Sequence, residues 1–90
     1  MIPDLDSFLA RYDALPLGSF EGLYENLRYG VTRTASPDGK RGWLYAEELG
    51  GDDHISLNLY RLESGAKLNP CEMPKQKVID FVLGLDVQDK

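Results

Sequence analysis

Strand-like segments separated by turn residues fill the middle of the chain, and they limit the fold more than any other feature. Four β-strands are expected, over residues 19–24, 28–34, 40–48 and 54–62. The intervening turns, at 25–26, 35–39 and 50–53, carry the Gly, Pro, Asn and Asp residues that favour tight reversals. Because connections this short join antiparallel neighbours, the pattern predicts an antiparallel β-meander.

Helical patterns flank the meander. In the first, apolar side chains recur at helical spacing at Leu5, Phe8, Leu9 and Tyr12. Asp4 or Asp6 is expected to cap this helix, and Pro16 and Gly18 to end it. A second helix is expected to begin at Pro74, since proline at the first helical position loses no hydrogen bond. Its apolar face contains Val78, Ile79, Phe81, Val82 and Leu85.

The chain of 90 residues is therefore expected to form one α+β domain, residues 1–90. Its sheet should contain four or five antiparallel strands, the fifth a short strand over 66–69. Both helices should pack on one face of that sheet. The polar residues 86–90 are expected to be a frayed tail.

Hairpin closure assigns each strand residue to one face of the sheet. The expected closing pairs are Tyr24 with Leu27, Thr34 with Arg41, and Leu49 with His54. The predicted core face is apolar and contains Phe20, Gly22, Tyr24, Tyr29, Val31, Leu44, Ala46, Ile55, Leu57 and Leu59. The predicted outer face is mixed and contains Glu21, Leu23, Arg28, Thr32, Trp43, Tyr45, Glu47, Ser56, Asn58 and Tyr60.

The outer face carries more aromatic residues than a solvated sheet needs. Trp43, Tyr45 and Tyr60 are expected to gather there, surrounded by Arg28, Asn58 and Ser56. Aromatic residues and arginine are enriched at binding hot spots, so these six residues predict a recognition platform or a homodimer face. The alternative is that the aromatic side chains stabilise neighbouring strands or lie beneath a loop.

An acidic stretch that includes Glu47, Asp52 and Asp53 precedes the single histidine, His54. Hard divalent cations prefer carboxylate oxygens, so a metal site at this loop is one interpretation. The spacing matches no EF-hand loop, and a solvated turn at a hairpin tip is the favoured alternative.

The single cysteine, Cys71, lies close to the expected start of the second helix. A thiol near a helix N-terminus can become nucleophilic because its pKa is lowered, and His54 is the one imidazole able to serve as a base. The favoured alternative is a buried, inert cysteine.

Cations are unevenly distributed, because Arg28, Arg33, Lys40 and Arg41 all lie on one expected hairpin. Cross-strand charge pairing is the favoured interpretation. An anion site on that hairpin is the alternative.

Charge and composition restrict which binding partners and which cellular location we expect. A net charge of −5 disfavours nucleic acid, because phosphate binding depends on positive charge. No apolar run reaches the roughly 20 residues that span a bilayer, and the first residues lack a signal-peptide pattern. One cysteine cannot form an internal disulfide. These features predict a cytoplasmic protein without membrane contact, and they indicate no cofactor.

Several segments carry a family resemblance. They are 29–33 (YGVTR), 44–51 (LYAEELGG), 55–60 (ISLNLY), 70–74 (PCEMP) and 78–81 (VIDF). Over about residues 15–85, the chain resembles a family of short, uncharacterised bacterial proteins, which implies a bacterial origin. Some members carry the name peptide methionine sulfoxide reductase. The Gly-Cys-Phe-Trp signature of that enzyme is absent, since Pro70 and Glu72 flank Cys71.

Together these features predict a small, non-enzymatic binding or interaction module. Its outer face would bind a protein partner or a second copy of the chain. A thiol-dependent or redox enzyme centred on Cys71 is the alternative, and a metal site at 47–53 is a weaker one.

Overall fold

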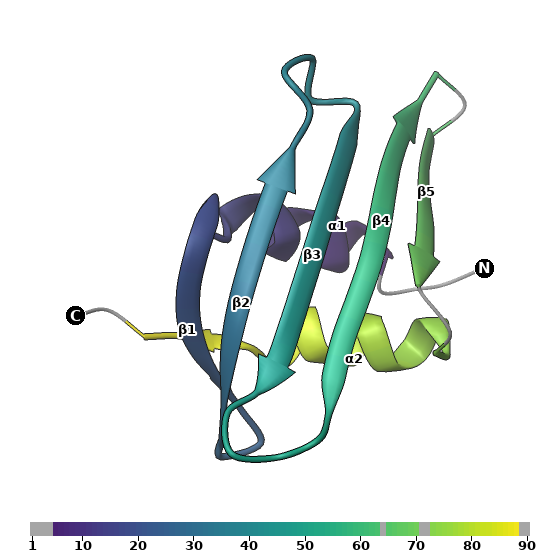
Figure 1. Ribbon diagram of the computed structural model, residues 1–90. Helices are drawn as coiled ribbons and strands as arrows, with labels where there is room; N and C mark the ends of the chain where they lie inside the picture. Colours follow the sequence, from purple (N-terminus) through teal and green to yellow (C-terminus); the bar gives the residue numbers. More distant parts are fainter. Residues whose placement is uncertain (1–4, 64, 71–72, 89–90) are drawn as a thin grey trace.

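The computed structural model describes residues 5–63, 65–70 and 73–88. Two helices and six strands follow one another along the chain (Figure 1). In order they are α1 (Leu5–Ala14), β1 (Gly18–Tyr24), β2 (Leu27–Ala35), β3 (Arg41–Glu48), β4 (His54–Leu62), β5 (Gly65–Pro70), α2 (Lys75–Gly84) and β6 (Asp86–Val87).

All six strands belong to one antiparallel sheet, in the order β5-β4-β3-β2-β1-β6. Both helices lie behind this sheet and cross its strands, so in the described part of the chain no helix covers the other face (Figure 1). The predicted α+β class and meander are confirmed. The short strand expected over 66–69 forms as β5, and β6 is an addition that the sequence did not indicate.

The tail expected to fray from residue 86 instead begins as a strand. Asp86 and Val87 pair with Leu23 and Gly22 of β1, and the Gln88 N–H donates to the Glu21 carbonyl at 3.0 Å. The buried Leu85 side chain anchors this segment, because the bare Gly22 backbone leaves room for it. The prediction of a frayed tail was therefore wrong for residues 86–88.

The β1–β2 register is the predicted one, with Tyr24 opposite Leu27. The β2–β3 register is displaced by two residues, so that Val31 lies opposite Ala46 instead of Leu44. The turn is tighter than expected because the Ser36 N–H donates to the Arg41 carbonyl at 2.8 Å. The strands consequently pair closer to the turn than the predicted closure of Thr34 on Arg41 allows.

The β3–β4 register is also displaced by two residues, and Leu44 lies opposite Leu57 instead of Leu59. The Glu48 N–H donates to the Asp53 carbonyl at 2.8 Å, so the four-residue loop is 49–52 and not 50–53. Leu49 lies in this loop and does not pair with β4; its N–H instead donates to the Arg28 carbonyl of β2 at 2.8 Å. The expected pair of Leu49 with His54 was therefore wrong.

The core lies between the sheet and the two helices. A displacement of two residues preserves the face of every side chain, so the predicted core face is the one that the helices cover. Its aromatic centre joins Tyr24, Tyr29 and Phe81, with ring centroids 5.0–6.2 Å apart. The buried apolar residues are Phe8, Tyr12, Leu15, Tyr29, Val31, Leu44, Ala46, Ile55, Leu57, Leu59, Leu68, Val78, Ile79, Phe81, Val82 and Leu85.

The helix boundaries differ slightly from those predicted. Helix α2 begins at Lys75, and Pro74 precedes it in an extended conformation as the N-cap residue. Asp6 lies in the first turn of α1, where its charge suits the helix dipole, whereas Asp4 lies outside the described residues. Within the part of the chain that the structure describes, neither helix is long and apolar enough to cross a membrane.

Candidate functional site

The outer face of the sheet presents two large aromatic side chains. Trp43 and Tyr45 are neighbours on one side of β3 and remain 38% and 47% exposed. Both helices cover the opposite face of the sheet (Figure 1). Residues two apart on a strand share a face, so the two rings form adjacent steps of one surface.

Polar residues of the neighbouring strands flank both aromatic positions. Thr32 of β2 and Ser56 of β4 lie opposite Tyr45. Thr34 and Asn58 lie opposite Trp43 in the same way. The structure thus brings Ser56 and Asn58 beside the aromatic pair, as the sequence predicted.

Tyr60 and Arg28 occupy different parts of the face. Tyr60 is half-buried and lies opposite Arg41, one step along β4 from Asn58. Arg28 lies beyond Gly30 on β2, and its guanidinium pairs with Glu21 at 2.6 Å. This ion pair raises the pKa of Arg28 and directs its side chain towards β1. Arg28 therefore does not surround the aromatic pair in the way we expected.

A different arginine contacts the indole. The Arg41 guanidinium carbon lies 5.4 Å from the centre of the Trp43 ring, within cation–π range. Arg41 precedes Trp43 by two residues on β3, and that spacing was the signal that could have identified it. On the other side, the rings of Tyr45 and His54 stack with centroids 6.4 Å apart and an interplanar angle of 26°.

A hollow of about 380 Å³ opens beside Tyr45. Its floor includes Gly30, which has no side chain, and Glu21 and Glu47 lie opposite Gly30 on the two neighbouring strands. Two strand spacings place the Cα atoms of these glutamates about 10 Å apart. Leu49 closes another side, since one of its methyl carbons lies 3.4 Å from where a Cβ of residue 30 would be.

The outer face of the sheet therefore combines exposed aromatic rings, acidic side chains and a hollow. We call the group formed by Gly30, Arg41, Trp43, Tyr45, Glu47 and His54 the outer-face site. Glu47 lies opposite His54, and among the described residues no cation is ion-paired with Glu47. An apolar ring beside a free carboxylate suits a ligand that carries both apolar surface and positive charge.

The acidic loop has a structural connection to the core. Asp53 accepts hydrogen bonds from the Tyr29 hydroxyl at 2.9 Å and from Lys77 Nζ at 2.7 Å. The Lys77 hydrogen bond and, to a smaller extent, that of Tyr29 lower the pKa of Asp53. Burial is the main cause of a raised pKa at Tyr29, and Asp53 adds to it.

The predicted metal ligands Glu47, Asp52 and Asp53 do not converge. Glu47 points to the outer face, whereas Asp53 contacts Tyr29 and Lys77 at the edge of the core. In ranges 5–63, 65–70 and 73–88, no three His, Cys, Asp or Glu side chains are placed to hold a metal ion. The thiol interpretation rests on Cys71, which lies outside the described residues, and its suggested base His54 lies on the outer face.

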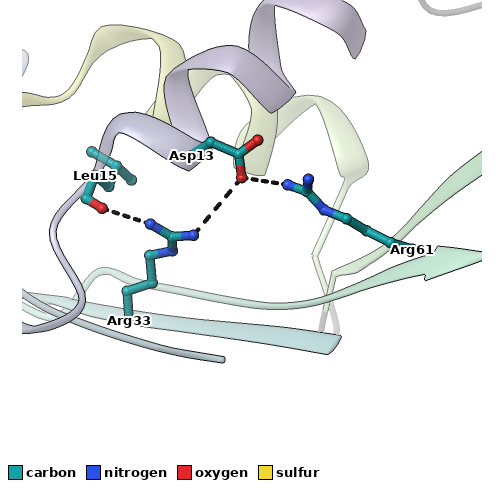
Figure 2. Close-up of polar contacts among 4 residues, drawn as sticks. All are labelled: Asp13, Leu15, Arg33 and Arg61. Carbon is teal, nitrogen blue, oxygen red and sulfur yellow. Dashed lines mark hydrogen bonds and ion pairs between the residues drawn. The ribbon is translucent and has the colours of Figure 1, made fainter. Parts of the chain in front are cut away.

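The cationic residues of the β2–β3 hairpin lie on different faces of the sheet. Arg28 and Arg41 lie on the outer face, while Arg33 points to the helix-covered side. There, Asp13 of α1 pairs with both Arg33, at 3.8 Å, and Arg61 of β4 (Figure 2). Arg33 also donates to the Leu15 carbonyl at 2.6 Å. The Arg28–Glu21 pair crosses two strands as the favoured interpretation predicted, whereas Arg33 pairs with a helix residue instead.

Comparisons of this chain with protein-family models, curated proteins and solved structures find no match. The family resemblance and the bacterial origin that it implies stay predictions. Functional inference therefore depends on the geometry of the chain itself.

Proposed function

We propose that this protein is a non-enzymatic binding module that docks a protein partner on the outer-face site. The observation that carries the proposal is an exposed Trp43–Tyr45 pair beside a hollow, on a sheet face without a helix above it. Tryptophan and tyrosine are among the residues that are enriched at the binding hot spots of protein interfaces.

The aromatic anchors are held in place before any partner arrives. Arg41 lies over the Trp43 ring, and His54 stacks on the Tyr45 ring. Side chains that are ordered in the free protein lose less conformational entropy on binding. These contacts therefore favour tight docking from a surface of modest size.

Charge favours a basic partner over a second copy of the chain. Glu47 borders the hollow together with Glu21, whose charge Arg28 already pairs, and the whole chain carries a net charge of −5. Two copies would repel each other through this net charge, while a basic segment would be attracted. We therefore infer that the partner presents a lysine or arginine side chain that enters the hollow between Tyr45 and Glu47.

Selection from a random peptide library, followed by affinity measurement for the selected peptides, tests the proposal. We expect the peptides to contain lysine or arginine and to bind Tyr45→Ala and Glu47→Gln at least about tenfold more weakly than the wild type. Leu17→Ala is the matched control, because Leu17 is exposed and apolar but lies before β1 and does not line the hollow. Its affinity should be unchanged.

Two results would argue against this function. Peptides that bind Tyr45→Ala as tightly as the wild type would place the binding surface elsewhere. Light scattering that shows mass increasing with concentration, abolished by Trp43→Ala, would assign the face to a homodimer instead of a basic partner.

A further inference from the structure

A second polar site lies on the helix-covered side of the sheet, beside Arg33 of β2. A cavity of about 200 Å³ opens there between the end of α1 and strands β2, β3 and β4. Its lining includes Tyr12, Asp13, Arg33, Gly42 and Arg61. The volume exceeds the roughly 30 Å³ that one water molecule occupies in the liquid.

Two buried polar atoms at this cavity are unpartnered. Tyr12 is only 1% exposed, and the Arg33 side chain only 12%. Among the described residues, neither the Tyr12 hydroxyl nor Arg33 Nε has a hydrogen-bond partner of acceptable geometry. Because buried polar groups are nearly always hydrogen-bonded, two such atoms around one cavity indicate a missing partner.

The Tyr12 hydroxyl is held at the cavity by its surroundings. A Cβ at Gly42 would lie 2.6 Å from that oxygen, so only glycine leaves room for it. The Arg33 guanidinium carbon lies 4.5 Å from the centre of the Tyr12 ring. Burial raises the pKa of the Tyr12 hydroxyl, and Arg33 partly opposes this through a hydrogen-bonding contact of poor geometry and through its charge, so the hydroxyl stays protonated at neutral pH.

Charge at the cavity selects the kind of partner. Arg33 and Arg61 face the Asp13 carboxylate (Figure 2), and Arg41 also lines the cavity, so three guanidinium groups against one carboxylate leave two net positive charges. The two unpartnered groups, an O–H and an N–H, can both donate. A ligand that accepts both hydrogen bonds and carries negative charge satisfies the site best.

We propose that the cavity between α1 and the sheet is an anion site that binds a small oxyanion, a carboxylate or a phosphate, through Tyr12, Arg33 and Arg61. The oxyanion would accept hydrogen bonds from the Tyr12 hydroxyl and Arg33 Nε, and Arg61 would add charge. The two hydrogen-bond donors of this site, Tyr12 and Arg33, lie on the helix-covered side of the sheet, whereas Arg41 both lines the cavity and contacts Trp43 of the outer-face site.

Isothermal titration calorimetry at constant ionic strength tests this site, with inorganic phosphate and, separately, acetate as probes. We expect saturable binding of one equivalent of at least one probe. Binding of phosphate alone would identify a phosphate site, and binding of acetate alone a carboxylate site. If neither probe binds saturably, the proposal is overturned.

Tyr12→Phe and Tyr24→Phe form a matched pair of variants. Tyr24 also packs in the core, but its ring lies in the Tyr29–Phe81 cluster and not at the cavity. Tyr12→Phe should weaken binding about tenfold or more, because one hydrogen bond to a charged ligand is lost, whereas Tyr24→Phe should not. Equal affinity in both variants would indicate an adventitious ion only and would overturn the assignment.

Stability without added anion provides a second measurement. Among the described residues, the Tyr12 hydroxyl has no hydrogen-bond partner of acceptable geometry, so Tyr12→Phe should leave Tm unchanged or raise it. The anion should raise Tm of the wild type by mass action, and that of Tyr12→Phe by less at the same concentration. A clear fall of Tm in anion-free Tyr12→Phe would show that the hydroxyl already has a structural partner, against the proposal.

Discussion

Tyr29, Asp53 and Lys77 join three elements of the fold at the end of the core. The Tyr29 side chain comes from β2 and is only 2% exposed, Asp53 precedes β4, and Lys77 comes from α2. We expect Asp53→Ala to lower the free energy of unfolding by about 1–4 kcal/mol. About 1–3 kcal/mol comes from the Tyr29 hydroxyl left without a partner.

The ion pair with Lys77 supplies the smaller part of this estimate. Both side chains are substantially exposed, Lys77 at 41% and Asp53 at 37%, so solvent screens the pair. Such pairs contribute up to about 1 kcal/mol. The partial exposure of Asp53 also lets water approach the Tyr29 hydroxyl, which favours the lower half of the range.

A double-mutant cycle with Tyr29→Phe isolates the hydrogen bond. In the wild type, Tyr29→Phe removes a hydrogen bond to a charged group and should cost about 1.5–3 kcal/mol. In the Asp53→Ala background, the same change removes an unpartnered hydroxyl, so its cost should approach zero or change sign. The expected coupling energy is therefore at least about 1 kcal/mol.

Urea unfolding followed by circular dichroism measures these differences, with the slope against urea as a check for two-state behaviour. Asp52→Ala is the control, since Asp52 is an exposed acid on the same loop and should change stability by less than about 0.5 kcal/mol. If Tyr29→Phe has the same cost in both backgrounds, the hydroxyl does not depend on Asp53, and the assigned role of this contact is refuted.

Two further predictions concern pH and packing. The pKa of Asp53 is lowered in the fold, so the stability that this carboxylate contributes is present above the unfolded pKa of about 3.9 and is lost as pH falls through the folded pKa. Asp53→Asn should therefore flatten the fall of the urea midpoint below about pH 4. An unchanged pH profile would contradict this prediction. Gly22→Ala should cost about 1–3 kcal/mol in thermal unfolding, because its Cβ would lie 2.6 Å from Leu85 Cδ1. Gly30→Ala is the control, since its Cβ would meet only an ordinary contact at 3.4 Å, and equal costs would argue against close packing at Gly22.

The faces of the sheet were predictable from the sequence, whereas two of its three predicted registers were not. Alternation has a period of two, so Leu44 and Leu57 fall on the core face whether or not the hairpin is displaced by two residues. The displacement depends on hydrogen bonds at the turns, such as Ser36 with Arg41 and Glu48 with Asp53. Those bonds follow from loop geometry that composition alone does not determine.

The other features that the sequence did not indicate depend on contacts between residues distant in the chain. Asp13 and Arg61 are 48 residues apart, and no local pattern indicates that they meet. Strand β6 has two residues, too few to show an alternation, and its place depends on Leu85 reaching the space above Gly22. At the outer-face site, the aromatic pair followed from alternation, but the Arg41 contact and the hollow at Gly30 required the register.

The pairing of β6 with β1 also bears on how the chain reaches its native structure. Among themselves, strands β1 to β5 pair only with neighbours in sequence, through loops whose closure is entropically cheap. By contrast, β6 meets β1 across more than sixty residues, and α1 meets α2 over a similar separation. Contacts of such high sequence separation are the slowest to form. The order of assembly should thus run from the central hairpins outwards, with the first and last segments of the domain joining one another at the end.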